Sequence, residues 1–245
     1  MSKIKVAILI SGFIRNWDET YKSLLNNLIE YNSENYQFDI FCLTYDRTTR
    51  YSKERSEIEQ VSDEEFEKLK RLIKPVSLKI LNHEKWNEHF TQEKKYYFDR
   101  ILNYTGFQYK LGGVIMQTHA MAQSFELMEQ HTKPYDIVMK TRFDIFYSEP
   151  CRMPHFDIHD ILMCSGHSNQ NFIDAVLIGR YDSMKVCMNS HSRLEDTHFM
   201  KRRRVRFTED LIRDNIRDAN LSIGLLDWRC DLAREWGKKH LYRED

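Results

Sequence analysis

The stretch Ile4-Lys5-Val6-Ala7-Ile8-Leu9-Ile10-Ser11-Gly12 is apolar without a break after Lys5 and ends in a Ser-Gly pair. A continuous apolar run of this length is typical of a parallel strand that is covered on both faces. Apolar residues at helical spacing follow up to Tyr31, with Asp18 as the expected N-cap, and the run Phe38–Asp46 then reads as a second strand. The three segments predict a β-α-β unit with a right-handed crossover.

The same pattern of strands and helices continues along the rest of the chain. Strands are expected at 76–81, 135–147, 160–164 and 175–179, and helices at 63–74, 86–109, 114–132, 182–191 and 208–218, with a short strand and a terminal helix in 221–242. The polar segment 47–62 shows no apolar periodicity and is interpreted as a surface loop. The sequence therefore predicts one α/β domain over 1–245, with a mixed, mainly parallel sheet flanked by helices.

Composition excludes several classes of protein. The 245 residues contain 37 Lys plus Arg and 37 Asp plus Glu, so no global charge attracts the chain to nucleic acid or to an anionic membrane. Five scattered cysteines form no C-x-x-C pair, which favours reduced thiols over a disulfide framework or a zinc cluster. No run approaches about 20 apolar residues, so we expect no integral membrane segment and a cytoplasmic protein.

Polar residues that directly follow the predicted strands are the candidates for a binding site, because open parallel sheets bind ligands at the carboxyl ends of their strands. Each of these residues alone is a weak signal, since turn and cap residues occupy the same positions. Together their hydroxyl, guanidinium and carboxylate groups suit a nucleoside diphosphate and its metal. The candidates are Ser11, Gly12 and Arg15 after the first strand, Tyr45 and Asp46 after the second, Arg142 and Asp144 in the 135–147 segment, and Gly179.

One of these segments carries a family resemblance. YDIVMKTRFDIFY at 135–147 resembles a group of bacterial and viral (large DNA virus) glycosyltransferase-like proteins in which an apolar strand ends in T-R-x-D. Shorter similarities are AILISGFIRNW, FDIFCLTYD, NFIDAVLIGRYDSM and FTEDLIRDNI. The resemblance implies a single-domain, Rossmann-like GT-A fold, with a nucleotide-binding half at 1–110 and a metal and acceptor half at 111–245.

The resemblance also implies roles for the residues of the strand end. Asp144 corresponds to the metal ligand of the D-x-D strand end and would hold Mn²⁺ or Mg²⁺ on the donor diphosphate, because these ions take hard oxygen ligands. Arg142 stands where the first acidic residue of D-x-D would be, so it would pair with phosphate or with a neighbouring carboxylate. Ser11, Gly12 and Arg15 would flank the nucleotide.

Residues for the transfer step are less specifically marked. Asp174 and Glu209 are the candidate bases for deprotonating an acceptor hydroxyl, and a loop carboxylate or a helix N-terminal acid is the plainer interpretation of each. His119, His167 and His191 could bind phosphate or metal but are individually more typical of packed or surface histidines. The basic run Lys201–Arg206 could neutralise a departing diphosphate, and a solvated loop is the simpler alternative.

The function predicted from the sequence is transfer of a hexose or deoxyhexose from a nucleoside diphosphate sugar to a glycan or lipid-linked acceptor. A non-catalytic nucleotide- or glycan-binding relative is the alternative, and a nucleic-acid-binding protein that uses the basic run ranks third. The chain lacks G-x-G-x-x-G and G-x-x-x-x-G-K-[ST] after the first strand, and it lacks G-x-S-x-G throughout. The chain therefore lacks the central motifs of dinucleotide-dependent dehydrogenases, P-loop enzymes and serine hydrolases.

Overall fold

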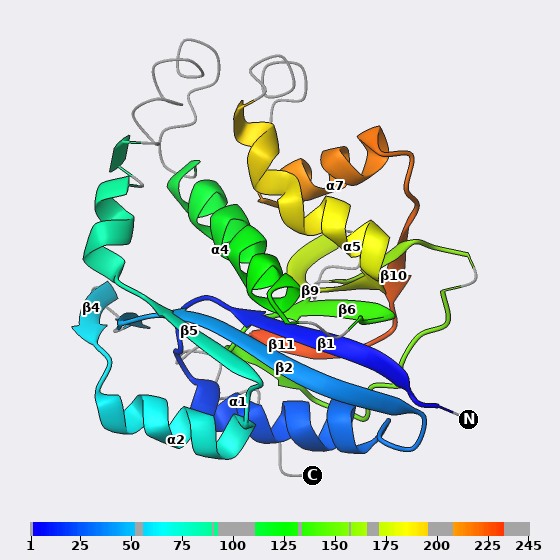
Figure 1. Cartoon of the computed structure of the whole chain (residues 1–245), viewed down its shortest axis with the longest axis horizontal. Coiled ribbons are helices and arrows are strands. Elements are labelled where there is room, and N and C mark those ends of the chain that lie inside the picture. The colour runs from blue at the N-terminus through cyan, green and yellow to red at the C-terminus, as the bar shows by residue number, and fades with distance from the viewer. Residues whose placement is uncertain are drawn as a thin grey trace.

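The described residues of the computed structural model, 2–51, 56–89, 91–92, 111–131, 134–156, 158–165, 172–195 and 208–232, contain a seven-stranded sheet with helices on both faces (Figure 1). The sheet runs in the order β10-β8-β9-β6-β1-β2-β5. Its strands are β1 (Ile4–Ser11), β2 (Tyr36–Tyr45), β5 (Ser77–Leu81), β6 (Ile137–Thr141), β8 (Ile161–Ser165), β9 (Phe172–Arg180) and β10 (Ile223–Leu226).

The strands are parallel except for β9, which runs antiparallel between β6 and β8. The predicted mixed, mainly parallel α/β sheet is therefore confirmed. The position predicted for Gly179 is wrong. Because β9 is antiparallel, Gly179 pairs with Val138 and Ile161 near the beginnings of those strands, at the edge of the sheet opposite the carboxyl ends.

Two sets of helices cover the faces of the sheet. Figure 1 shows α4 (Leu111–Glu129), α5 (Tyr181–Met188) and α7 (Thr208–Asp218) on one face, with α1 (Trp17–Leu24) and α2 (Asp63–Ile73) on the other. The π-helix η1 (Leu25–Glu30) continues α1, and the 3-10 helix η2 (Asn189–Glu195) continues α5. Residues 83–89 and 91–92 are also helical, and the rest of the helix expected up to residue 109 lies outside the described residues.

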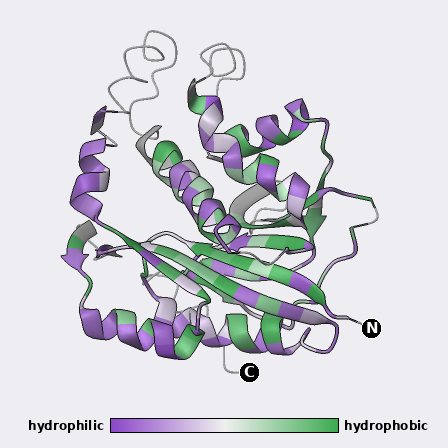
Figure 2. Cartoon of the chain, viewed as in Figure 1, coloured by the Kyte–Doolittle hydropathy of each residue, from purple (hydrophilic) through white to green (hydrophobic). Residues whose placement is uncertain are grey.

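The alternation of side chains along β1 divides the core into two clusters. Val6, Ile8 and Ile10 pack under α1 and α2 with Trp17 and Phe66, while Ala7 and Leu9 pack under α4, α5 and α7. Figure 2 shows the apolar strands between helices whose outer sides are hydrophilic. Burial on both faces explains why β1 is an unbroken apolar run in the sequence. Among the described residues, no helix has the length and apolar character needed to span a membrane.

Three local predictions are corrected. The segment 47–62 is an antiparallel hairpin of β3 (Arg47–Tyr51) and β4 (Ser56–Gln60), in place of the expected loop. Helix α1 begins at Trp17 after Asn16, whose φ is 54°, so Asp18 lies in the first turn and is not the N-cap. The expected strand 135–147 is two strands, because β7 (Ile145–Tyr147) leaves the main sheet and pairs with β11 (Cys230–Leu232).

Other boundaries agree with the sequence. Ser62 caps α2 at the expected start of this helix, since its Oγ accepts a hydrogen bond from the Glu65 backbone N–H at 3.2 Å. Helices α5 and α7 occupy the expected ranges within a few residues. The predicted terminal helix falls largely in 233–245, outside the described residues.

Candidate functional site

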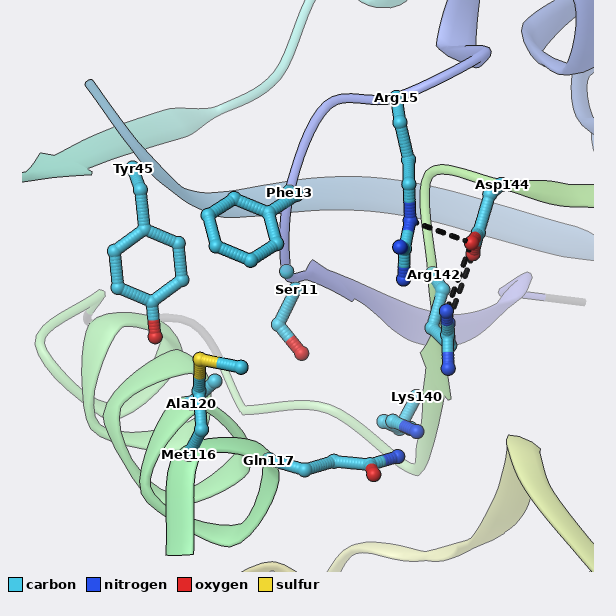
Figure 3. A pocket seen from close by; sticks show the side chains of 11 residues that line it. Ser11, Phe13, Arg15, Tyr45, Met116, Gln117, Ala120, Lys140, Arg142 and Asp144 are labelled. Carbon is cyan, nitrogen blue, oxygen red and sulfur yellow. Dashed lines mark hydrogen bonds and ion pairs between the residues drawn. The ribbon is translucent and has the colours of Figure 1, made fainter. Parts of the chain in front are cut away.

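A pocket opens at the carboxyl ends of β1, β2 and β6 and is closed on one side by α4 (Figure 3). Its position follows from the sheet, because three parallel strands end at the same edge and the segments after them diverge. The pocket is lined by Ser11, Gly12, Phe13, Arg15, Tyr45, Met116, Gln117, Ala120, Lys140, Arg142 and Asp144. The structure thus brings six of the predicted site residues together: Ser11, Gly12, Arg15, Tyr45, Arg142 and Asp144.

At the end of β1, Gly12 leaves the backbone uncovered by a side chain, so a ligand can approach the main chain closely. Gly12 has φ +123°, a conformation that side chains with a Cβ rarely adopt, and its N–H donates to the Leu43 carbonyl at 3.1 Å. A Cβ built on Gly12 would meet no described heavy atom within 4 Å, so the glycine is required by its backbone angle and not by crowding. Ser11, which is 5% exposed, directs its hydroxyl toward the middle of the pocket (Figure 3).

Asp144 lies between two arginines. Arg142 donates from Nε to Oδ1 and from Nη2 to Oδ2, both at 2.8 Å, and Arg15 donates from Nε to Oδ2 at 3.0 Å. Of the two partners expected for Arg142, phosphate or a carboxylate, the structure has the carboxylate. Burial of Asp144 raises the pKa of its carboxyl group, but the two guanidinium groups outweigh that effect and the pKa is lowered overall. Asp144 is therefore a buried, ionised carboxylate with two cationic partners.

Helix α1 and its π-helical continuation fix the segment that follows Asp144. The Thr20 hydroxyl donates to the Phe143 carbonyl, the Ser23 hydroxyl accepts from the Tyr147 N–H at 3.1 Å, and the Asn27 amide donates to the Tyr147 carbonyl at 2.7 Å. These bonds satisfy backbone groups where the chain leaves the main sheet between β6 and β7. The turn that carries Arg142 and Asp144 is thus held by side chains about 120 residues away in sequence.

Two polar residues of the pocket were missed by the sequence interpretation. Lys140 is 1% exposed and comes from β6, where it is the one charged residue in the run Ile137–Thr141. A lysine inside an otherwise apolar strand is the signal that could have marked it. Gln117 comes from α4, and its amide oxygen accepts from the Thr208 hydroxyl at 3.0 Å. Nothing in the helical pattern of α4 distinguishes Gln117 from the other polar residues of that helix.

The remaining predicted residues lie elsewhere. Asp46 is outside the pocket lining, and its carboxylate accepts from the Asn82 amide at 2.9 Å and from the His83 N–H at 2.8 Å, so it fixes the segment after β5. Glu209 stands in the first turn of α7, next to the Thr208 that contacts Gln117. Asp174 is in the first part of β9, whose antiparallel course brings that end to the carboxyl edge of β6, but its side chain is not among those described.

The candidate histidines form a cluster beside the pocket. The Trp86 indole donates to His119 Nδ1 at 3.2 Å, and the rings of His119 and His191 meet edge to face with centroids 5.4 Å apart. Neither histidine lines the pocket. His167 and the basic run Lys201–Arg206 lie outside the described residues. Within the described part of the chain, no group of three or more His, Cys, Asp or Glu side chains could hold a metal ion.

The sheet order, the antiparallel β9 and the pocket at the carboxyl edge define a protein with a GT-A-like fold. No protein-family model matches the chain, and no curated protein matches its sequence. A solved nucleoside-diphosphate-sugar pyrophosphorylase from Vibrio cholerae RC9 is similar over 98% of this chain and 100% of its own, with a TM-score of 0.52 and 10% identity. At that identity the likeness concerns the fold alone.

Glycosyltransferase structures are similar at lower scores. The apo form of GlyE from Streptococcus pneumoniae TIGR4 has a TM-score of 0.44 and 12% identity, over 91% of this chain and 45% of GlyE. A Drosophila galactosyltransferase 7 mutant in complex with manganese, UDP-Gal and xylobiose has a TM-score of 0.43 and 10% identity, over 91% of this chain and 65% of the other. The chain spans less than half the length of the GlyE structure.

Proposed function

We propose that the chain is a glycosyltransferase that moves a hexose or deoxyhexose from a nucleoside diphosphate sugar to a glycan or lipid-linked acceptor. The observation that supports it most is the pocket at the carboxyl edge of β1, β2 and β6. Three cationic side chains, Arg15, Lys140 and Arg142, and one carboxylate, Asp144, are among the described residues that line it. Guanidinium and ammonium groups in such a setting bind phosphate by charge-assisted hydrogen bonds.

The pocket has a second, aromatic side. The rings of Phe13 and Tyr45 lie 5.1 Å apart between centroids and stand across from the cationic residues (Figure 3). Aromatic faces of this kind suit a nucleobase or the apolar face of a sugar. In the proposed complex the nucleoside lies beside these rings, and the diphosphate extends past Gly12 toward Arg15 and Arg142.

Transfer requires a new bond between an acceptor oxygen and the anomeric carbon of the donor sugar. The bond from that carbon to the diphosphate breaks, the nucleoside diphosphate leaves with the electron pair, and the acceptor hydroxyl loses its proton to a base. We assign Glu209 and Asp174 as the candidate bases. Glu209 follows Thr208, whose hydroxyl donates to Gln117 of the pocket lining, and Asp174 belongs to the first part of β9.

The metal implied by the family resemblance does not fit the described donor set. Among the described residues of the pocket lining Asp144 is the one carboxylate, and both of its oxygens accept hydrogen bonds from arginines. A divalent cation prefers several oxygen ligands and would here lie against guanidinium groups. The proposed transfer therefore contains no metal step, and dependence on Mn²⁺ or Mg²⁺ stays a prediction from the resemblance, as do the acceptor class and the cytoplasmic location.

A turnover assay tests the proposal. The full chain is incubated with UDP-, GDP- and dTDP-hexoses and an oligosaccharide or lipid-linked acceptor, and released nucleoside diphosphate is measured. We expect acceptor-dependent release, reduced about 100-fold or more by Glu209→Gln or by Asp174→Asn, the magnitude typical for loss of a general base. Asp227→Asn, an exposed carboxylate, serves as the control. Nucleotide binding without release for any donor would favour the non-catalytic relative and overturn the enzymatic proposal.

A further inference from the structure

The charged residues of the pocket lining, Arg15, Lys140, Arg142 and Asp144, determine which ligand chemistry the site can take. Arg15 and Arg142 each have about one fifth of their side chain exposed, while Asp144 and Lys140 are almost fully buried. The two guanidinium groups are therefore more accessible than the carboxylate that they contact.

The carboxylate of Asp144 is occupied by hydrogen bonds from two arginines. Its two oxygens accept three charge-assisted hydrogen bonds, two from Arg142 in the side-by-side geometry that a guanidinium group makes with a carboxylate. A cation bound to either oxygen would have to displace a guanidinium group and would then lie close to that positive charge. Among the described residues that line the pocket, Asp144 is the one carboxylate.

Two buried donors in the pocket provide an independent indication of a ligand. The Gln117 amide nitrogen and the Tyr45 hydroxyl are both buried, and neither has a hydrogen-bond partner among the described residues. Burial raises the pKa of Tyr45, so its phenol stays protonated and can donate. Buried donors without acceptors are costly, and both belong to residues that line this pocket. Oxygen atoms of a bound ligand would satisfy them.

We propose that this site binds the diphosphate of its nucleotide through protein cations in place of a divalent metal ion. Arg15, Lys140 and Arg142 contact the phosphate oxygens, and Asp144 is a positioning residue that orients the two arginines. Gln117 and Tyr45 donate to the remaining oxygens of the ligand. The inference rests on the proposed function for the presence of a nucleoside diphosphate, and goes beyond it in assigning the charge compensation to the chain itself.

The test compares nucleotide affinity in three buffers. Protein freed of metal with EDTA is titrated calorimetrically with UDP, GDP and dTDP in EDTA, in Mg²⁺ and in Mn²⁺. We expect the dissociation constant of the best nucleotide to agree within about threefold among the buffers, because charge compensation comes from the protein. Affinity that appears in Mn²⁺ or Mg²⁺ and is lost in EDTA would overturn the inference while leaving the proposed function standing. Absence of binding in every buffer would overturn both.

Variants separate a positioning role of Asp144 from a metal-ligand role. Arg142→Gln and Lys140→Met should each weaken binding about 10-fold or more in every buffer, the scale of one lost hydrogen bond to a charged group. Arg71→Gln, an exposed arginine at the end of α2, is the matched control. Asp144→Asn should also weaken binding in EDTA, since the arginines lose their anchor. If Asp144→Asn weakened binding only in Mn²⁺, Asp144 would be a metal ligand and the inference would be wrong. Should Asp144→Asn fold poorly, the affinity of Arg142→Gln and the comparison of the three buffers still distinguish the two roles.

Discussion

At the scale of single residues, the charge of Asp144 is the feature on which the site depends. A carboxylate that is 3% exposed would ordinarily be protonated or absent, because burial disfavours its charged form. Arg142 and Arg15 reverse that preference and lower its pKa. The arginines in turn need the carboxylate, since two guanidinium groups so close together would otherwise repel each other. The three side chains are therefore stable as a unit.

This dependence predicts a pH-dependent stability. The pKa of Asp144 is lower in the folded chain than the value of about 3.9 for an unfolded aspartate, so its ionised form stabilises the fold above about pH 4, and this contribution disappears as pH falls through the folded pKa. Asp144→Asn should therefore lower the free energy of unfolding at pH 7, and the gap to the wild type should narrow in acid. Urea unfolding from pH 7 down to the lowest pH with a cooperative transition measures it. The explanation by the Asp144 charge would be ruled out if the difference in unfolding free energy between variant and wild type stayed constant over that range. It would also be ruled out if the exposed Asp227→Asn gave the same pH dependence.

The backbone angle of Gly12 can be tested by adding a Cβ. Gly12→Ala adds a Cβ in open space but forces φ +123° on a residue that rarely adopts it. We expect a loss of about 1 to 3 kcal/mol in the free energy of unfolding and weaker nucleotide binding, because relief of the strain moves the backbone next to Ser11. Chemical unfolding and calorimetry measure the two effects.

Gly179→Ala is the comparison for that variant. Its Cβ would lie 2.7 Å from the Asp160 carbonyl oxygen, at the far edge of the sheet, so it should lower stability and leave binding unchanged. Wild-type stability and affinity in Gly12→Ala would contradict the role given to the backbone angle.

Residue patterns predicted only part of the site. Arg142 and Asp144 come directly after the apolar strand β6, and a charged pair at the end of an apolar run is visible in the sequence. Lys140 was missed because side chains alternate along a strand, and which of them face the pocket depends on the neighbouring strand and helix. Asp46 directly follows β2 as predicted but is outside the pocket lining, because the segment after β5 returns beside it and takes its carboxylate as a hydrogen-bond acceptor.

Among the helices and strands, α1 and its continuation η1 support the carboxyl edge of the sheet. Helix α1 lies across the sheet from α4, and three polar side chains of α1 and η1 hold the turn between β6 and β7. These side chains are Thr20 and Ser23 from α1 and Asn27 from η1. The two helices thereby connect the end of β1 to the segment that presents Asp144.

Thr20→Val tests this connection with little change in shape. The substitution removes the hydroxyl that donates to the Phe143 carbonyl and leaves that carbonyl without a side-chain donor, so we expect a loss of about 1 to 3 kcal/mol. Thr20→Ser, which keeps the hydroxyl, should lose less. Urea unfolding of the two variants gives the comparison, and equal losses would show that packing of the methyl group, and not the hydrogen bond, is what matters.

Elements with long apolar runs were predicted well, and those defined by pairing were not. The hairpin β3–β4 was interpreted as a loop because its strands, RTTRY and SEIEQ, consist mostly of charged and polar residues and show no apolar periodicity. The division between β6 and β7 was missed because both halves are apolar and only the partner strand, β11, distinguishes them. The direction of β9 is likewise set by its neighbours and by no residue of its own.

At the scale of the whole molecule, charge is balanced overall and concentrated locally. The chain has no formal net charge, yet the pocket lining contains three cations and one carboxylate. The fold produces this difference, because the carboxyl ends of β1 and β6 bring together residues that are more than 120 positions apart. A local positive field of this kind favours the approach of an anionic small ligand.

Calorimetric titration of the wild-type chain and of Lys140→Met with UDP, GDP and dTDP tests whether this pocket binds a nucleoside diphosphate. At least one nucleoside diphosphate should bind to the wild type, and Lys140→Met should weaken that binding about 10-fold or more, because a buried cation of the pocket is lost. Lys185→Met, which alters an exposed lysine on α5, should bind as the wild type does. Absence of binding by every nucleotide at millimolar concentration, or equal affinity in Lys140→Met, would contradict the assignment of this pocket.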